Sequence, residues 1–443
     1  MQVSSESLGA VERPATAMVE ERRKNRRVAG ASLIGTLIEG YDLIIYGTAA
    51  ALVFPEIFFP ALGSAAGTLA SLATFAVAFI ARPFGSILFG HFGDRLGRKR
   101  TLVTTLMLMG VSTVVVGLIP PASMIGIAAP VLLIACRIVQ GVSQGGEWAG
   151  ATLFVAEHVP ANRRGFFAMF PQLGAVLPLP LSSITFLVIG LTLSDEAFVS
   201  WGWRIPFLAS GLLIVVGLWL RLTVDETPVF KAEQARTMTT SVPFLEAFKR
   251  QPLVIVLGSG VALTAFSLVY ISSTYLTNYA TTTLDMDRTT VLLSGLAGGV
   301  VYCVSTAFAA ALSDRIGRVR MLMAGHIAAA AWALMLFPIV NGQSFSHLTL
   351  AMCISFFIAG LVYGPIGAYL PELFKTKYRY TATGFTYNIS GVIGGGLIPI
   401  LAPVLIETYS TVAFGLLLSG VCVVAAICTI RLGENRNRDL REI

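Results

Sequence analysis

Residues 90–98 read Gly-His-Phe-Gly-Asp-Arg-Leu-Gly-Arg and end a long apolar segment. Residues 310–318, about half the chain length later, read Ala-Ala-Leu-Ser-Asp-Arg-Ile-Gly-Arg. The pattern Gly-x-x-x-Asp-Arg-x-Gly-Arg is therefore present twice, with Ala310 in place of the first glycine of the second copy. This period is too long for a solenoid. It indicates two similar halves with a charged loop at the same place in each, an architecture found in membrane transporters.

Composition excludes a soluble protein, because 55% of the residues are apolar, only 12% are charged and the mean hydropathy is +0.77. Segments of about 20 apolar residues, enough to cross a hydrocarbon core of about 30 Å, recur along the chain. They must be helices, because lipid cannot pair with free backbone groups. We expect twelve spans, at residues 28–53, 66–90, 101–119, 126–156, 166–191, 203–223, 252–277, 289–313, 320–340, 347–370, 380–406 and 410–430.

The basic residues predict the orientation. Residues 1–27 lack the apolar core of a signal peptide, and the basic run 22–27 directly precedes the first span. With the N-terminus inside, all but four of the 31 Lys and Arg residues fall in the tails and the predicted cytoplasmic loops; the four are Arg82, Arg137, Arg204 and Arg288. We therefore expect a multi-pass protein of the cell membrane with both termini in the cytoplasm.

A polar stretch divides the chain into two six-helix bundles. A looser repeat, Glu157 to Arg164 and Glu372 to Arg379, supports this division. The expected organisation is a cytoplasmic tail at 1–27, an N-terminal bundle at 28–223, a cytoplasmic linker at 224–251, a C-terminal bundle at 252–430 and a cytoplasmic tail at 431–443.

The rest of the sequence offers few candidates for reactive or metal-binding groups. The net charge of +7 reflects the cytoplasmic bias of the basic residues and needs no nucleic acid partner. The five cysteines lie singly in apolar spans, which fits neither a disulfide framework nor a zinc site. No nucleophile–base pair or phosphate loop is evident, so we expect no enzyme activity, no metal and no cofactor.

The acidic residues expected inside the membrane all lie in the N-terminal half. Glu39 and Asp42 share one face of the first span with Tyr46, and a similar stripe of the fourth span carries Arg137, Gln140, Gln144 and Glu147. Charge at membrane depth costs at least about 2.5–3.5 kcal/mol per residue, so such residues usually face a cavity or a partner. The two stripes are therefore predicted to converge on a central cavity.

Within this cavity Asp42 and Glu39 are the candidates for proton coupling. Arg137 is predicted to bind a substrate carboxylate or to pair with Asp42, and Gln144 and Glu147 to complete the pocket. A buried ion pair that only fixes helix packing is the alternative for Arg137 and Asp42. Arg82 either points toward the cytoplasm or contacts substrate.

The second half has no charge inside its expected spans and instead offers hydroxyls and aromatic rings. Such groups suit a small polar metabolite whose hydroxyls need partners once desolvated. Together with Tyr46 of the first half, Tyr270, Thr274 and Tyr387 are predicted to contact substrate.

The two charged loops are predicted to gate the inner side. A carboxylate at a helix end can accept hydrogen bonds from the amides at the start of a neighbouring helix and pair with nearby arginines. Such clusters would hold the halves together until the inner side opens. The gating candidates are Asp94, Arg95 and Arg98 in the first copy and Asp314, Arg315 and Arg318 in the second.

These stretches resemble the major facilitator superfamily, in which the repeated loop is a hallmark. More narrowly, the chain is similar to the metabolite:proton symporter family, and residues 41–100 are similar to its shikimate-transporter branch. The matching stretches are Tyr41-Asp42 with Tyr46-Gly47, Arg82-Pro83-Phe84-Gly85, Arg137 with Gln140-Gly141 and Gly145-Gly146-Glu147, Trp203-Arg204-Ile205-Pro206, Glu226-Thr227-Pro228 and Tyr378-Arg379-Tyr380.

The resemblance implies a monomeric secondary transporter that imports a small organic acid, shikimate-like or dicarboxylate-like, together with protons. Its partners would be that acid, protons and the lipid bilayer. Family members also carry zwitterions such as proline and betaine, which remains an alternative. Proton-coupled efflux by the same fold is a second alternative, and a transport-dead membrane sensor is a remote third.

Overall fold

The computed structural model describes residues 15–96, 98–158, 163–223, 243–375 and 378–436, and these are helical without strands. The side chains of Asp94, Arg95 and Arg98 lie outside the described part, so the first gating cluster remains a prediction. Most of the predicted linker, residues 224–242, and the outer parts of both predicted tails also lie outside it.

Six membrane crossings form the N-terminal half. Short helices connect them at one end: α2 (Phe54–Phe58), η1 (Pro60–Leu62), α5 (Ala122–Ile125), α9 (Asp195–Ser200) and η3 (Gly202–Arg204). The crossings are α1 (Ala15–Leu52), α3 (Gly63–Leu96), α4 (Arg98–Leu118), α6 (Ala128–His158), the pair α7 (Arg164–Val176) and α8 (Pro178–Thr192), and α10 (Ile205–Thr223).

The C-terminal half repeats this plan. It begins with α12 (Pro243–Arg250), and η5 (Pro371–Leu373) follows its fourth crossing. The crossings are α13 (Pro252–Val261) continued by α14 (Leu263–Tyr270), η4 (Ile271–Tyr275) and α15 (Leu276–Thr282); α16 (Arg288–Ile316); α17 (Arg318–Val340); α18 (Phe345–Tyr369); α19 (Arg379–Ser390) continued by η7 (Gly391–Leu397) and α20 (Ile398–Thr408); and α21 (Thr411–Leu432).

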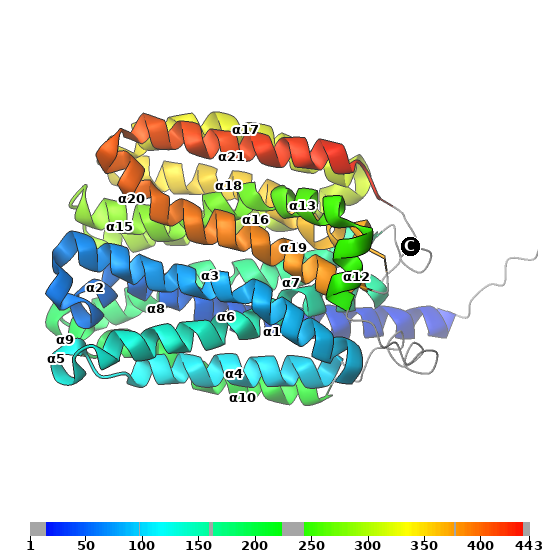
Figure 1. Cartoon of the computed structure of the whole chain (residues 1–443), viewed down its shortest axis with the longest axis horizontal. Helices are drawn as coiled ribbons and strands as arrows, with labels where there is room; N and C mark the ends of the chain where they lie inside the picture. The colour runs from blue at the N-terminus through cyan, green and yellow to red at the C-terminus, as the bar shows by residue number, and fades with distance from the viewer. Residues whose placement is uncertain (1–14, 97, 159–162, 224–242, 376–377, 437–443) are drawn as a thin grey trace, which may run out of the picture.

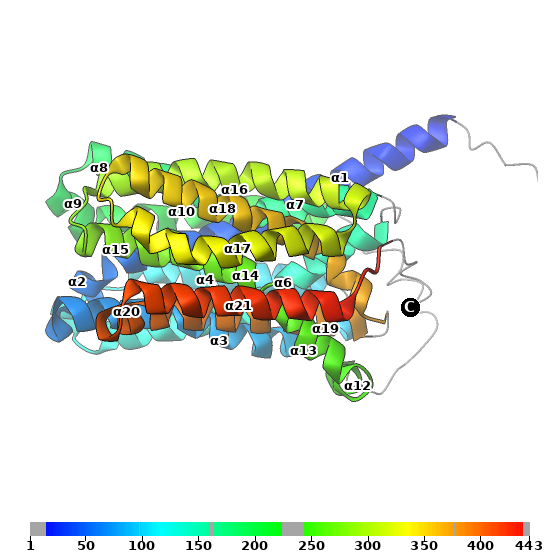
Figure 2. The ribbon, with the colours of Figure 1, turned by 90° about the horizontal axis from the view of Figure 1, so that it is seen from above.

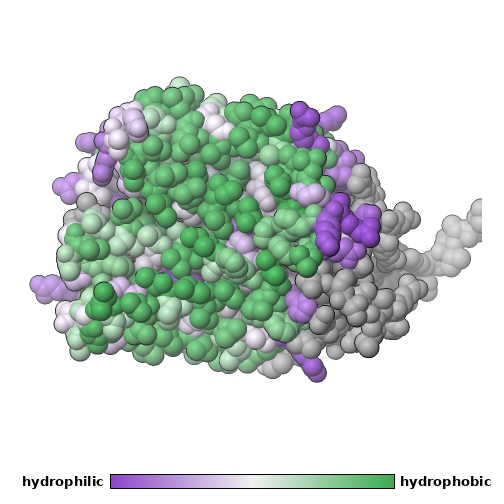
Figure 3. Space-filling model, in the orientation of Figure 1, coloured by the Kyte–Doolittle hydropathy of each residue, from purple (hydrophilic) through white to green (hydrophobic). Residues whose placement is uncertain are grey.

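The long helices run side by side along one axis (Figures 1 and 2). Because α1 begins and α21 ends at the same end of the bundle, we call this the basal end; the basic residues predict that it faces the cytoplasm. Eleven helical stretches of the described chain are long and apolar enough to cross a membrane, and α1 supplies the twelfth expected span. On the face shown in Figure 3, apolar residues cover the middle, and hydrophilic residues lie toward the two ends.

Two crossings of the C-terminal half contain π-helical segments, η4 and η7. Such segments often occur at functional sites. The η7 segment is rich in glycine, and a Cβ atom on Gly394 or Gly395 would meet Leu263, Phe266 or Tyr270 of the neighbouring crossing. Glycine therefore permits close contact between these two crossings. Their π-helical segments lie near the centre of the molecule.

Candidate functional site

A cavity of about 70 Å³ lies at the centre, between the two halves. The N-terminal half contributes α1, α3, α6, α7 and α8, and the C-terminal half contributes α14, α16, α18 and α19. Its polar and aromatic lining consists of Thr36, Glu39, Arg82, Gln144, Trp148, Phe266, Tyr270, Tyr302, Tyr363, Tyr387 and Asn388. The predicted substrate residues Gln144, Tyr270 and Tyr387 and the predicted coupling residue Glu39 thus lie together.

Arg82 is the guanidinium that lines this cavity. Its Nε and Nη2 atoms lie 3.1 and 2.6 Å from Oε1 of Gln144, and its Cζ atom lies 4.2 Å from the ring centre of Phe79. Only 5% of its surface is exposed. A guanidinium fixed in this way at a cavity wall can bind a carboxylate through two parallel hydrogen bonds.

Aromatic rings from both halves form another part of the wall. The rings of Trp148 and Tyr387 stack with centres 3.6 Å apart and an interplanar angle of 4°. The hydroxyls of Tyr387 and Tyr363 lie 2.9 Å apart, and Phe266 packs against Tyr387 with ring centres 4.9 Å apart. The cavity is therefore bounded by aromatic faces and hydroxyls, with Arg82 and Glu39 as its charged groups.

Gln172 of α7 connects the two halves beside this wall. Its Oε1 accepts a hydrogen bond from the Trp148 indole at 2.9 Å, and its Nε2 donates to the Tyr363 carbonyl at 2.6 Å. Asn388 donates to the Gly145 carbonyl at 2.9 Å, a second contact between the halves. The Gln172 bonds lie on the basal side of the cavity, because Gln172 precedes the lining residues Ala175 and Val176 on a helix that begins at the basal end.

Asp42 and Arg137 do not line the cavity, and they do not contact each other directly. Asp42 accepts a hydrogen bond from Thr113 at 2.8 Å. Arg137 donates to Gln140 at 2.8 Å and lies 3.8 Å above the ring of Tyr46. Since α6 runs toward the basal end, Arg137 lies about two helical turns farther from that end than Gln144.

The other predicted substrate residues also lie outside the cavity lining. Tyr46 bonds Thr74 at 2.7 Å, and its ring supports Arg137. Thr274 is buried in η4 and packs near Gly47. Glu147 is fully buried on α6, next to Trp148. Their roles in substrate binding remain predictions.

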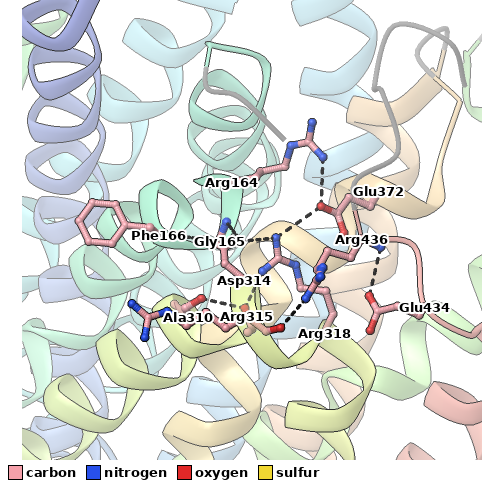
Figure 4. A network of polar contacts seen from close by, with 11 residues as sticks. Arg164, Gly165, Phe166, Ala310, Asp314, Arg315, Arg318, Glu372, Glu434 and Arg436 are labelled. Atoms are coloured by element: carbon pink, nitrogen blue, oxygen red, sulfur yellow. Dashed lines mark hydrogen bonds and ion pairs between the residues drawn. The ribbon is translucent and has the colours of Figure 1, made fainter. Parts of the chain in front are cut away.

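The second charged loop forms a buried network at the basal end (Figure 4). The Asp314 carboxylate accepts hydrogen bonds from the backbone amides of Gly165 and Phe166, at 2.9 and 2.8 Å, in the first turn of α7. Arg318 pairs with Asp314 at 2.8 Å. The sequence led us to expect contacts of this kind, and the role of the cluster as a gate remains a prediction. The Arg315 carbonyl accepts from Arg436, so this residue contributes through its backbone.

Glu372 completes the network from the other side. Its Oε1 lies 3.1 Å from Arg164 and 3.7 Å from Arg318, and its side chain is fully buried. Burial raises the pKa of the Glu372 carboxyl above its usual value, against the attraction of Arg318 and Arg164. The pair Arg164–Glu372 joins the N-terminal half to the C-terminal half.

Several of these contacts were missed from the sequence. The equal Glu-to-Arg spacing at 157–164 and 372–379 pointed to Arg164 and Glu372, but it did not show that the two copies pair across the halves. Trp148 and Gln172 carried no signal, because an indole and an amide inside an apolar span look like packing residues. Among the described residues no group of three His, Cys, Asp or Glu side chains could hold a metal.

At the opposite end, two polar contacts between described residues join the halves. Arg288 pairs with Asp195 at 3.1 Å, and Asn278 donates to the Ala51 carbonyl at 3.4 Å. A second cavity of about 590 Å³ lies here, lined in part by Glu56 and Arg288. The central cavity is thus separated from both ends by contacts between the halves.

Comparison with known proteins places this arrangement in a family. Residues 32–399 match the profile of the Major Facilitator Superfamily. The inner membrane metabolite transport protein YhjE of Escherichia coli is 40% identical over 94% of this chain and 95% of its own length. The shikimate transporter of Escherichia coli is 35% identical over 93% and 95% of the two chains.

Two further comparisons concern a relative that transports other solutes and a solved structure of the same fold. The proline/betaine transporter of Salmonella typhimurium is 32% identical over 94% of this chain and 85% of its own length. The fold matches the proton:xylose symporter XylE bound to 6-bromo-6-deoxy-D-glucose, with a TM-score of 0.79 at 18% identity over 95% of this chain and 98% of that one. The family and the all-helical transporter fold predicted from the sequence are therefore confirmed.

Proposed function

The chain belongs to the Major Facilitator Superfamily, and on that premise we propose that it imports a small organic acid together with protons by alternating access. It is a multi-pass membrane transporter and not an enzyme, as the family implies. Beyond the family, we propose the class of substrate, the coupling ion and the direction of transport. The observation that carries it is the buried guanidinium of Arg82 in a small cavity between the two halves.

The cavity chemistry supports an anionic substrate. A desolvated carboxylate needs a cationic or hydrogen-bonding partner, and Arg82 offers a planar pair of donors beside Gln144. The hydroxyls of Tyr363 and Tyr387 can bond the hydroxyls of a polyhydroxylated acid. The relative that is a shikimate transporter fits this chemistry.

Proton coupling is supported by two carboxylates at membrane depth. Glu39 lines the cavity, and Asp42 lies one turn farther along the same helix, where it is 2% exposed. Buried carboxylates inside a membrane are costly and commonly serve proton transfer. We assign Asp42 to the coupled proton and Glu39 to a site where substrate and proton meet.

A zwitterionic substrate is the second candidate, because the cavity holds Glu39 as well as Arg82. A quaternary or secondary ammonium group would lie against the aromatic faces of Trp148, Phe266 and Tyr387 beside this carboxylate. Because proline/betaine transporters are among the relatives, proline and glycine betaine are the zwitterions to test.

Uptake into proteoliposomes tests the proposal. The purified protein is reconstituted, an inward proton gradient is imposed, and labelled shikimate, 2-oxoglutarate, proline and glycine betaine are supplied in turn. We expect uphill accumulation of a carboxylate that a protonophore abolishes. Accumulation of the zwitterions alone would favour the second candidate, and export alone would show an efflux transporter. No gradient-driven movement of any compound would contradict proton coupling.

A further inference from the structure

We propose that Thr113 and Gln140 form a hydrogen-bonded link through which protonation of Asp42 acts on the guanidinium of Arg137. This inference rests on the proposed function, in which Asp42 exchanges the coupled proton. It assigns a positioning role to two residues outside the substrate cavity. Neither residue touches the substrate site described above.

The link is continuous and sealed from water. Thr113 of α4 donates from Oγ1 to Oδ2 of Asp42 at 2.8 Å. Gln140 of α6 donates from Nε2 to Oγ1 of Thr113 at 2.8 Å. Arg137 donates from Nη1 to Oε1 of Gln140 at 2.8 Å. All four side chains are at most 2% exposed, so water does not compete for these bonds.

A hydroxyl suits both protonation states of a carboxyl group. It donates to a carboxylate, and it accepts from a carboxylic acid. The Thr113 hydroxyl has a second acceptor in reach, the Met109 carbonyl at 3.1 Å. When Asp42 takes up a proton, its new O–H bond points to the Thr113 oxygen, and the threonine hydrogen turns to Met109. No buried donor is left unpaired in either state.

The change at Thr113 alters its bond with Gln140. While Asp42 is ionised, the threonine oxygen accepts from Gln140 alone. Once Asp42 is protonated, the same oxygen accepts from Asp42 as well, so the two donors share it and the Gln140 bond weakens. Because Gln140 orients Arg137, the guanidinium loses part of its positioning together with its nearby negative charge.

Arg137 is placed to pass this change toward the cavity. Its guanidinium lies over Tyr46, donates to the Phe75 carbonyl at 3.4 Å, and leaves Nε without a partner. The Phe75 ring in turn packs against the cavity residue Tyr270, with ring centres 5.5 Å apart. The contacts therefore continue from the N-terminal half to the C-terminal half.

The surroundings single out Arg137 as the partner of Asp42. It is the charged residue to which the hydrogen bonds through Thr113 and Gln140 connect Asp42. Tyr41 is the titratable neighbour on α1 itself, while Thr113 of α4 and Ser210 of α10 are neutral. Glu39, on α1, and Arg82, on α3, line the cavity instead.

The test compares two activities of reconstituted protein. One is uphill accumulation, driven by an imposed proton gradient, of whichever of shikimate, 2-oxoglutarate, proline or glycine betaine the wild type accumulates. The other is exchange of the same compound at equal pH on both sides. The variants are Thr113→Val, which removes the hydroxyl at nearly the same volume, and Thr113→Ser, which keeps it.

Thr105→Val is the matched control. Thr105 lies two turns earlier on α4, is fully buried, and donates to the carbonyl of Leu102 on its own helix. Gln140→Met is the second link variant, because methionine has a similar length and no hydrogen-bonding amide.

We expect Thr113→Val and Gln140→Met to lower accumulation about tenfold, the effect of one lost buried hydrogen bond to a charged group, while exchange stays within about twofold of wild type. Thr113→Ser and Thr105→Val should retain both activities. Wild-type accumulation by Thr113→Val overturns the link alone. Equal loss of accumulation and exchange also overturns it, because the hydroxyl then serves folding or binding. A wild type that accumulates none of the four compounds contradicts both the link and the proposed function.

Discussion

At the scale of single residues, the site depends on arginines held by neutral partners. Arg82 lies against Gln144 and Phe79, and Arg137 lies against Gln140 and Tyr46. Neither forms an ion pair with a described carboxylate. A guanidinium remains charged in proteins, so Arg82, which lines the cavity, is available to an anion that arrives from outside.

Replacing Arg82 tests its role in substrate binding. Lysine keeps the charge but cannot form the planar two-point contact with a carboxylate. We expect Arg82→Lys to raise the substrate concentration for half-maximal exchange by about tenfold or more, equivalent to about 1.4 kcal/mol. Arg431→Lys, at the exposed end of α21, is the control and should behave as wild type. An unchanged half-saturation in Arg82→Lys would remove Arg82 from the site.

The sequence predicted which residues lie near the cavity better than it predicted which residues contact each other. Glu39, Gln144, Tyr270 and Tyr387 lie at the cavity as expected, since polar stripes on amphipathic membrane helices point inward. The separation of Asp42 from Arg137 by Thr113 and Gln140 was not predictable, because helical periodicity gives a direction on each helix but not the relative height of two helices.

At the scale of helices, the halves meet through side chains of α6, α7, α18 and α19. Trp148 and Gln172 of the N-terminal half bond and stack on Tyr363 and Tyr387 of the C-terminal half. The same rings line the cavity. A substrate that displaces them would therefore loosen the closure toward the basal end.

Gln172→Leu tests this closure, because it removes both hydrogen bonds at similar volume. In a background without the five native cysteines, Ala265→Cys places a thiol on the cavity wall. We expect Gln172→Leu to increase the labelling of this thiol from the basal end by about threefold, the effect of shifting a two-state equilibrium by about 0.6 kcal/mol.

Gln251→Leu is the control for this measurement. Gln251 also donates and accepts hydrogen bonds, but its partners Leu373 and Tyr378 belong to its own half. Its labelling rate should match that of the background protein. Equal labelling in both variants would show that Gln172 does not hold the halves closed.

At the scale of the whole molecule, the two copies of the Glu-to-Arg repeat meet. Arg164 follows the fourth crossing of the first half, and Glu372 follows the fourth crossing of the second. They bond each other across the halves, and Arg379 also donates to the Phe374 carbonyl. The repeat predicted two similar bundles from the sequence alone. Which copy contacts which depends on how the bundles pack, and the spacing does not encode that.

Removing Glu372 should destabilise the molecule strongly. Loss of one member of a buried ion pair costs about 3–5 kcal/mol. We expect Glu372→Ala to lower the free energy of unfolding by this amount in detergent, because Arg164 and Arg318 stay buried and lose this carboxylate, while Arg318 keeps Asp314. Glu407→Ala, at an exposed position, serves as the control. A loss below about 1 kcal/mol, the range of exposed pairs, would show that the network is not structural.

The same residue predicts a pH dependence. Because burial raises the pKa of Glu372 in the folded state, the part of the folding stability that depends on its bound proton is fully present below the pKa of the unfolded chain. This part is lost as the pH rises through the folded-state pKa, while the contacts with the two arginines remain. The melting temperature of wild type, compared with that of Glu372→Gln, which has no carboxyl group at this position, should therefore fall as the pH rises above the range in which an ordinary carboxyl group titrates. A constant difference across that range would contradict the assignment.

The central claim is that substrate and proton cross the membrane together, with Asp42 carrying the proton. The most direct measurement records the internal pH of proteoliposomes with an enclosed dye while substrate is added outside. We expect acidification of the lumen on addition of the transported compound to wild-type protein, and none with Asp42→Asn, which should still exchange labelled substrate. Substrate uptake by wild type without any proton movement, or unchanged acidification with Asp42→Asn, would contradict the account.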